Sequence, residues 1–548
     1  MNGTAKPEQL RSWKAIAAYL GCSVRSARRW EAEEELPVHR HMHKSQGTVY
    51  AYAHELDAWR QRGEKRNPSS AKGAGTELDR SIAVLPFSYV GPDPANEYIA
   101  DGFTEEIIAD LSKIRALRVI SRTSSMTLKD THRNARSIAK TLNVRYLLEG
   151  TVRQQRDSLR ISTRLIDPAS DDRLWAGKYD GAIDEVFTIQ EKIARDVADA
   201  LHLRLTVDDD RRLAKHSVED VAAWRYALQA RQEALRWRPE SIDQAISLLE
   251  TALESAGEVP VFLAALGRTW LHYREAGIDT GPNPIDQAER YAERIAAIDP
   301  DSAAGLQLAG WIHYARGELR DAVRSLNLAM RQEPNDPDTL GLLANCYLLS
   351  GRGVLARPVI DRLLAVDPLT PLNRCLPGWA DALEGDFASA VDPYRDMYEL
   401  DPGNPLARLF YIWILASADK RDDALALATS FPDVLSGSLP QQVAAVFAAG
   451  LAGGTSTDAA GLTEQADVIA MSGDMFPRLI AQAHALTGDA QSATHWMSLA
   501  VDRGFINYPF LAEHDPLLAP VRDEPEFQAL LVDVRQRWER FDEQPDHG

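Results

Sequence analysis

Cysteine is scarce in this chain of 548 residues: the only three are Cys22, Cys346 and Cys375, and they lie far apart. No CxxC pair occurs, so the pattern indicates neither a disulfide framework nor a zinc site. The opening stretch MNGTAKPEQL lacks the apolar segment of a signal peptide, and no apolar run reaches the roughly 18–20 residues that span a bilayer. We therefore expect a cytoplasmic protein with no membrane contact.

Sequence motifs of catalysis are missing as well. The chain has no P-loop, no GxGxxG after a strand, no GxSxG and no HExxH. "GRG" at 351–353 stands alone, without the rest of a nucleotide fingerprint. We expect no enzyme, no catalytic residues, no cofactor and no metal. A nucleotide-signalling enzyme is the weakest alternative, because no motif supports it.

Charge is distributed unevenly along the chain. Residues 1–66 hold twelve Lys and Arg against eight Asp and Glu, a formal charge of +4, whereas the whole chain carries −19. The remainder therefore carries −23. Since an acidic body repels nucleic acid, any contact with DNA must be confined to the basic head.

A 34-residue period runs through the second half of the chain. Prolines keep this interval at Pro300, Pro334, Pro368 and Pro402. The same interval separates Gly317, Gly351, Gly385 and Asp419. It also separates Ala288, Ala322, Ala356, Ala390 and Ala424. Glycine tolerates positive φ where the first helix of a unit turns, and proline stops the second helix.

This pattern resembles the tetratricopeptide repeat, a helix–turn–helix unit of the same length. It predicts an all-α superhelix over 215–548 with degenerate end repeats, in which 241–253 and 487–501 are second helices of further units. The resemblance implies a groove that holds a protein or peptide partner.

Residues 81–205 alternate between strand and helix patterns. Strands are expected at 81–87, 117–123, 144–155, 159–167 and 173–181, and helices at 96–114, 135–143 and 186–201. The stretches IAVLPF, YIADGFTEEIIADLSKI, LRVISRTSSM, YLLEGTVR and LWAGKYD resemble the TolB amino-terminal (FlgO-like) domain. The resemblance covers essentially the whole segment and implies a two-layer α/β interaction module.

A polar cluster follows the second expected strand, at Ser121, Thr123, Ser124 and Ser125. Its hydroxyls suit a small ligand, but a Ser/Thr-rich turn after a strand explains them more simply. Both interpretations stay open at this stage.

The head begins with two short helical patterns. SWKAIAAYL (12–20) has Ser12 as an N-cap before an apolar stripe, and Gly21 ends it. Ser23 then caps a second helix that runs from 24 to about 31. A short helix, a glycine turn and a short helix form the helix-turn-helix arrangement.

The second helix has a packed side and a basic side. Val24, Ala27 and Trp30 share the apolar side, and Arg25 and Arg29 lie one turn apart on the opposite side. Arginine has a planar fork that pairs with guanine edges or phosphate oxygens. The pattern favours a DNA-reading helix over the alternative, a basic helix surface without a target.

A hairpin pattern and a third helix follow. LPVHRHMHKSQGTVYAY (36–52) predicts two strands around KSQG, and HELDAWRQR (54–62) predicts a short helix. Together with SWKAIAAYLGCSVRSARRWE, this order resembles the MerR/excisionase-type winged helix-turn-helix family over 12–62. The chain lacks the dimerising coiled coil of MerR proteins, and a homodimer is left open.

The resemblance implies two sets of DNA contacts. The second helix would supply groove and phosphate contacts, and the hairpin, or wing, would supply backbone or minor-groove contacts. The residues are Ser23, Arg25, Ser26, Arg28 and Arg29 for the helix, and Arg40, His41, His43 and Lys44 for the wing. His39, His41 and His43 share one face of a strand, which also suggests a metal site, but phosphate contact explains them more simply.

The expected protein is therefore multidomain. It has a winged helix-turn-helix domain at 1–62, a flexible linker at 63–80, an α/β TolB amino-terminal-like domain at 81–205 and the tetratricopeptide-repeat array. The function that fits is a cytoplasmic transcriptional regulator whose head binds double-stranded DNA and whose other domains receive a protein or small-molecule signal. The alternative is a repeat scaffold with no DNA role.

Overall fold

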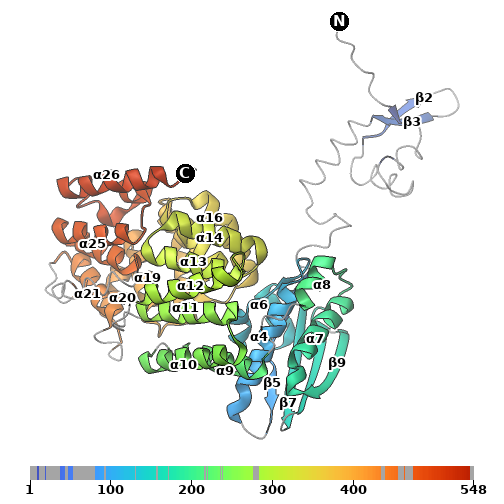
Figure 1. The fold of residues 1–548 in the computed structure, drawn as a ribbon. Coiled ribbons are helices and arrows are strands. Elements are labelled where there is room, and N and C mark those ends of the chain that lie inside the picture. Colours follow the sequence, from blue (N-terminus) through green and yellow to red (C-terminus); the bar gives the residue numbers. More distant parts are fainter. Residues whose placement is uncertain are drawn as a thin grey trace. The chain divides into compact units, whose positions relative to one another are not determined.

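The computed structural model describes residues 9–10, 19, 37–42, 47–52, 80–91, 94–129, 131, 133–155, 158–170, 172–214, 218, 220–234, 236, 238–275, 283–432, 438–454, 462 and 473–542. The chain forms two compact units, residues 1–79 and 80–548. Within the described ranges it is mostly helical, with a mixed sheet and a helical repeat region (Figure 1).

The first unit contains a three-stranded sheet. Its strands are β1 (Gln9–Leu10), β2 (His39–Met42) and β3 (Gly47–Tyr52), in the order β1-β3-β2. β2 and β3 pair antiparallel, which confirms the two strands expected around KSQG. Apart from Tyr19, which is helical, the expected helices of 12–31 lie outside the described residues. The winged helix-turn-helix arrangement therefore stays a prediction.

The second unit begins with a sheet domain, residues 81–200. Its strands are β4 (Ser81–Val84), β5 (Ser88–Val90), β6 (Arg118–Val119), β7 (Tyr146–Gln155), β8 (Ser158–Asp167) and β9 (Asp172–Ala182). They follow the order β6-β4-β7-β8-β9, and β5 pairs with β7. β4 runs parallel to both β6 and β7, whereas β7, β8 and β9 form an antiparallel meander.

Helices cover both faces at the parallel end of this sheet. α4 (Tyr98–Ser112) and α7 (Val186–Ala200) pack on one face, where Phe103 and Ile193 share a core with Val152 of β7. α6 (Ala135–Leu142) packs on the other face with Leu147. All of β4 is buried because both of its faces are covered. On the α6 side, β8 and β9 stay largely open, and the Arg160 side chain is 60% exposed.

One expected strand is shorter than predicted. The apolar pattern suggested a strand over 117–123, but β6 ends at Val119 and α5 (Arg122–Met126) begins shortly after it. The reason is local, because Ser121 is extended and its side chain accepts a hydrogen bond from Ser124 N as an N-cap. The capping serine turns the chain into a helix before the strand can continue.

The short helix α8 (Val207–Ala214) follows the sheet domain. The helices after it, within residues 221–540, form what we call the repeat array. The array contains α9 (Val221–Ala234), α10 (Pro239–Ala256), α11 (Pro260–Glu275), α12 (Pro284–Ile298), α13 (Ala303–Arg316), α14 (Leu319–Gln332), α15 (Pro337–Leu349), α16 (Gly353–Val366), α17 (Pro371–Leu383), α18 (Phe387–Leu400), α19 (Pro405–Ser417), α20 (Arg421–Thr429), α21 (Leu439–Leu451), α24 (Met475–Leu486), α25 (Ala490–Asp502) and α26 (Pro525–Arg540). Successive helices from α11 to α16 lie side by side (Figure 1).

The 34-residue period corresponds to these helix pairs. Gly317, Gly351 and Gly385 each follow the first helix of a pair and have φ of 80°, 71° and 90°, and Asp419 has φ 59° in the same place. The left-handed turn is cheap for glycine and costs an aspartate more, so the turn is imposed by the packing of the repeat. Both expected second helices are present, as α10 and α25.

Candidate functional site

Most of the predicted DNA contacts lie outside the described residues. This applies to Ser23, Arg25, Ser26, Arg28, Arg29, His43 and Lys44. Arg40 and His41 lie on β2, opposite Val49 and Thr48 of β3. The structure thus places two of the predicted wing residues on a strand of a hairpin.

The serine cluster of the sheet domain binds a carboxylate of the repeat array. Ser121 Oγ and Ser124 Oγ each donate a hydrogen bond to Asp367 Oδ1 at 2.5 Å. Asp367 follows α16, and its Oδ2 accepts hydrogen bonds from Thr370 Oγ1 and Asn373 Nδ2, both at 2.7 Å. Asp367 is only 3% exposed, so these four donors replace the water that its charge has lost. The two hydroxyls that the sequence offered to a ligand are therefore used within the chain.

Main-chain contacts surround this carboxylate. Ser121 N donates to Val366 O at 2.7 Å, and Leu369 N donates to Ser124 Oγ at 2.9 Å. The Arg118 guanidinium donates to Ala365 O at 2.5 Å. The loop after α16 is thus held against the end of β6 by both side-chain and main-chain hydrogen bonds. No sequence pattern indicated this contact, because the same Asp-Pro pair occurs at 299–300 and 401–402.

Two carboxyl groups, Glu106 on α4 and Asp336 just before α15, have raised pKa values. Glu106 of α4 accepts a hydrogen bond from Trp224 Nε1 of α9 at 3.3 Å. Burial, with the nearby Asp110 carboxylate, raises the pKa of Glu106 to about 7. Burial and Asp338 likewise raise the pKa of Asp336 in the repeat array. Glu106 is thus a titratable group at a contact between the sheet domain and the repeat array.

The inner side of the middle repeats is covered by the chain's own C-terminal part. One hydrophobic cluster joins α15, α17 and α19 with α24, residues 505–521 and α26. Main-chain and side-chain hydrogen bonds run from Ile506 N to Leu349 O at 3.0 Å and from Asn507 Nδ2 to Leu348 O at 3.2 Å. Contacts of Arg352 with Trp538 O and Asp542 extend this covering to the end of the described chain.

A buried arginine lies at the centre of this packing. Arg478 of α24 is 4% exposed, and its guanidinium carbon lies 4.4 Å from the ring centroid of Trp379 and 5.4 Å from that of Trp413. Burial lowers the pKa of Arg478, and burial raises the pKa of the nearby Asp474, although their opposite charges offset part of each shift. The aromatic faces compensate the cation where hydrogen-bond partners are few.

One group of side chains in the described part of the chain could offer three ligand atoms to a metal ion. It consists of His313, Glu318 and Asp321, whose ligand atoms lie within 4.8 Å of one another. His313 Nδ1 already lies 2.7 Å from Glu318 Oε2. The group is partly exposed at a repeat turn, and Asp321 is also paired with Arg324, whose Nη1 lies 3.1 Å from Asp321 Oδ1.

A search of the described helices finds none that is long and apolar enough to cross a membrane. The two described cysteines, Cys346 and Cys375, are buried and unpaired. Burial raises the pKa of the Cys375 thiol to about 12, which makes this thiol a poor nucleophile.

The fold thus defines a class: an α/β domain fastened to a tetratricopeptide-repeat array. Residues 78–196 match the second domain of the HilA/YgeH-like transcriptional regulators, and residues 313–372 match the tetratricopeptide repeat. The chain therefore contains a HilA-like transcriptional-regulator domain and tetratricopeptide repeats. The first match falls where the sequence suggested the TolB amino-terminal domain.

Two curated relatives from Rhizobium meliloti (strain 1021) are similar to part of the chain. The protein named "Putative adenylate cyclase 3" is 37% identical over 174 residues, which are 32% of this chain and 30% of that protein. The cytochrome c-type biogenesis protein CycH is 28% identical over 116 residues, which are 21% of this chain and 30% of that protein. The chain thus spans less than a third of the length of either relative.

Two solved structures are also similar to part of the chain. A thermophilic tetratricopeptide-repeat protein of Thermus thermophilus is 21% identical, with a TM-score of 0.30, covering 36% of this chain and 100% of that one. PilF of Pseudomonas aeruginosa is 19% identical, with a TM-score of 0.32, covering 40% of this chain and 95% of that one.

Proposed function

We propose that this chain is a cytoplasmic transcriptional regulator that binds double-stranded DNA through its first 62 residues. The observation that carries the proposal is the HilA-like transcriptional-regulator domain at 78–196, directly after the basic head. The charge of +4 on residues 1–66 and the β2–β3 hairpin are in accord with a DNA-binding wing. The chain then brings a large acidic body to DNA, and no chemical step is assigned to it.

In this proposal the head is a MerR-type winged helix-turn-helix domain. Arg25 and Arg29 enter the major groove, with Ser23, Ser26 and Arg28 beside them on the phosphates. Arg40, His41, His43 and Lys44 of the wing contact the backbone or the minor groove. The sheet domain acts as a TolB-like interaction module, and a homodimer would carry two heads that read two half-sites.

The repeat array supplies the protein-binding surface. Its helices carry exposed apolar side chains on the part that the C-terminal segment does not cover, including Val354 at 82% and Leu355 at 50% exposure on α16 and Leu372 at 54% on α17. Exposed apolar side chains on a repeat surface favour a protein or peptide partner. This surface serves a scaffold equally well, so the head decides between the two functions.

DNA binding of the full-length chain tests the proposal. Duplexes selected from a random-sequence pool are titrated over a range of salt concentrations. We expect the logarithm of the binding constant to fall linearly with that of salt, by about 0.9 per neutralised phosphate. Arg25→Ala/Arg29→Ala should weaken binding at least about tenfold, because two base-reading guanidinium groups are lost.

The matched control removes two positive charges elsewhere. Arg290 and Arg331 are exposed on the repeat array, and Arg290→Ala/Arg331→Ala should bind DNA as the parent does. A parent chain without salt-sensitive DNA binding would instead establish the scaffold alternative.

A further inference from the structure

The chain segments that follow two adjacent parallel strands of the sheet domain lead to opposite faces of the sheet. β4 is followed by α4 on one face of the sheet, whereas the adjacent β6 is followed by α5 and α6, and α6 packs on the opposite face. In open α/β sheets, ligands bind in the crevice outside the carboxyl ends of strands at such a reversal. The reversal therefore marks a place to look for a ligand site.

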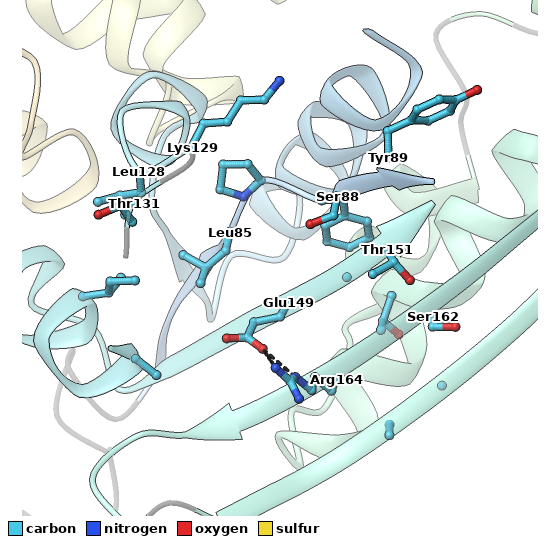
Figure 2. A pocket seen from close by; sticks show the side chains of 18 of the residues that line it. Leu85, Ser88, Tyr89, Leu128, Lys129, Thr131, Glu149, Thr151, Ser162 and Arg164 are labelled. Carbon is cyan, nitrogen blue, oxygen red and sulfur yellow. Dashed lines mark hydrogen bonds and ion pairs between the residues drawn. The ribbon is translucent and has the colours of Figure 1, made fainter. Parts of the chain in front are cut away.

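A cavity of ≈ 1120 Å³ opens at this place. Its lining includes residues 85–89, which follow β4, and Leu128 and Ile138 from the segment that follows β6. Figure 2 shows Leu85 and Leu128 on one side and the Glu149–Arg164 pair of the sheet on the other. One wall is thus apolar and the other is polar.

The polar wall is the open face of the meander. Glu149, Arg164 and Ala176 lie in one cross-strand row, and Thr151, Ser162 and Lys178 lie in the next. Thr151, Ser162 and Ala176 are short, so the strands leave space above them instead of filling it. Among the described residues, α6 packs on this face beside Leu147 of β7, and the part of the face over β8 and β9 stays open to solvent.

The lining carries an excess of positive charge. It holds two carboxylates, and both are neutralised: Glu97 by Lys129 at 2.8 Å and Glu149 by Arg164 at 2.5 Å. Arg133, Arg173 and Lys178 also line the cavity, are exposed, and form no ion pair with another described residue. With five cationic and two anionic side chains, the lining has a formal excess of three positive charges in a chain of net charge −19.

We propose that this cavity binds a small organic anion that carries at least two phosphate or carboxylate groups. The separate cations from 133, 173 and 178 call for more than one anionic group, and the apolar wall at Leu85, Leu128 and Ile138 receives the carbon body. The volume of ≈ 1120 Å³, slightly above the roughly 300–1,000 Å³ of ordinary ligand pockets, has room for one small molecule. The proposal goes beyond DNA binding and stands without it, because every residue it uses belongs to the sheet domain.

Calorimetric titration of the full-length chain tests this site. Pyrophosphate and citrate are the probes, one for phosphate and one for carboxylate, and KCl holds the ionic strength constant. We expect at least one probe to bind and to raise the unfolding temperature. Arg173→Glu/Lys178→Glu should weaken that binding by at least about tenfold, because attraction by two cations becomes repulsion.

The control variant is Arg160→Glu. Arg160 lies on the same open face one row further from the cavity, is paired with Asp180 and does not line the cavity. It should bind the probe as the parent does. The proposal is overturned if neither probe binds beyond the KCl effect, or if Arg160→Glu weakens binding as much as the double variant. DNA binding is measured on the same samples, and its outcome tests the proposed function of the head independently of this cavity.

Discussion

Asp367 accepts hydrogen bonds from Ser121, which lies 246 residues earlier in the chain, and from Ser124 beside it. The contact fastens the sheet domain to the repeat array through one buried carboxylate. Its neighbours in the repeat, Thr370 and Asn373, complete the set of donors. The position of the sheet domain on the array therefore depends on a residue whose equivalent one period later, Asp401, is exposed.

Replacing this carboxylate should loosen the two domains. Asp367→Ala leaves the buried hydroxyls of Ser121 and Ser124 without their acceptor, and we expect it to lower the free energy of unfolding by about 2–3 kcal/mol. Urea unfolding and limited proteolysis between the domains measure the change. Asp401, the exposed equivalent one period later, is the control, and equal effects of the two alanine variants would rule out a special role for Asp367.

The turn at Gly351 should be less tolerant of a side chain than that at Gly488. Both have left-handed φ, 71° and 76°, so alanine costs each about 1 kcal/mol or more in backbone strain. A Cβ at 351 would also lie 2.9 Å from Asn507 Oδ1 and Trp538 Nε1, whereas one at 488 meets nothing within 4 Å. We expect Gly351→Ala to lose about 1–3 kcal/mol more than Gly488→Ala in thermal unfolding. Equal losses would mean that the C-terminal segment does not pack on this turn.

Stability should depend on pH through Glu106. Its pKa is about 7 in the folded chain, against 4.5 for the free side chain. Between these values the folded state holds more protons than the unfolded state, so this group's contribution falls as pH rises from 4.5 to 7. Glu106→Gln removes the buried charge and should make the chain more stable than the parent at about pH 8 by about 1–3 kcal/mol, with little difference at about pH 4.5.

Denaturant unfolding at a series of pH values measures this difference. Glu254 on α10 is exposed, and Glu254→Gln should leave the pH profile of the parent unchanged. A Glu106→Gln profile parallel to that of the parent would show that Glu106 ionises as freely in the folded chain as in the unfolded one.

Local patterns predicted elements that depend on local interactions. The apolar spacing at 96–114 predicted a helix, and α4 covers residues 98–112. The strand expected over 117–123 was wrong beyond Val119, because a capping hydrogen bond of Ser121 outweighs the strand propensity of its neighbours. The predicted head could not be compared in the same way, since its helices lie outside the described residues.

The serine cluster shows why a site is harder to predict than an element. Its residues indicated hydroxyls in a turn, and that is what α5 and its cap are. Their partner is an aspartate whose surroundings in the sequence repeat at 299 and 401. Asp367 differs from Asp299 and Asp401 only in lying where the sheet domain packs against the repeat array.

By itself the sequence determined the periodic features of this protein. The 34-residue interval defines helix pairs, because turns with positive φ and close helix contacts restrict the same positions in every unit. Tertiary structure decided which surfaces of those units are available. The C-terminal segment buries the inner side of the middle repeats, and Asp367 holds the sheet domain at their edge. Both are contacts between distant segments, and their energy comes from burial and complementary charge that no local pattern records.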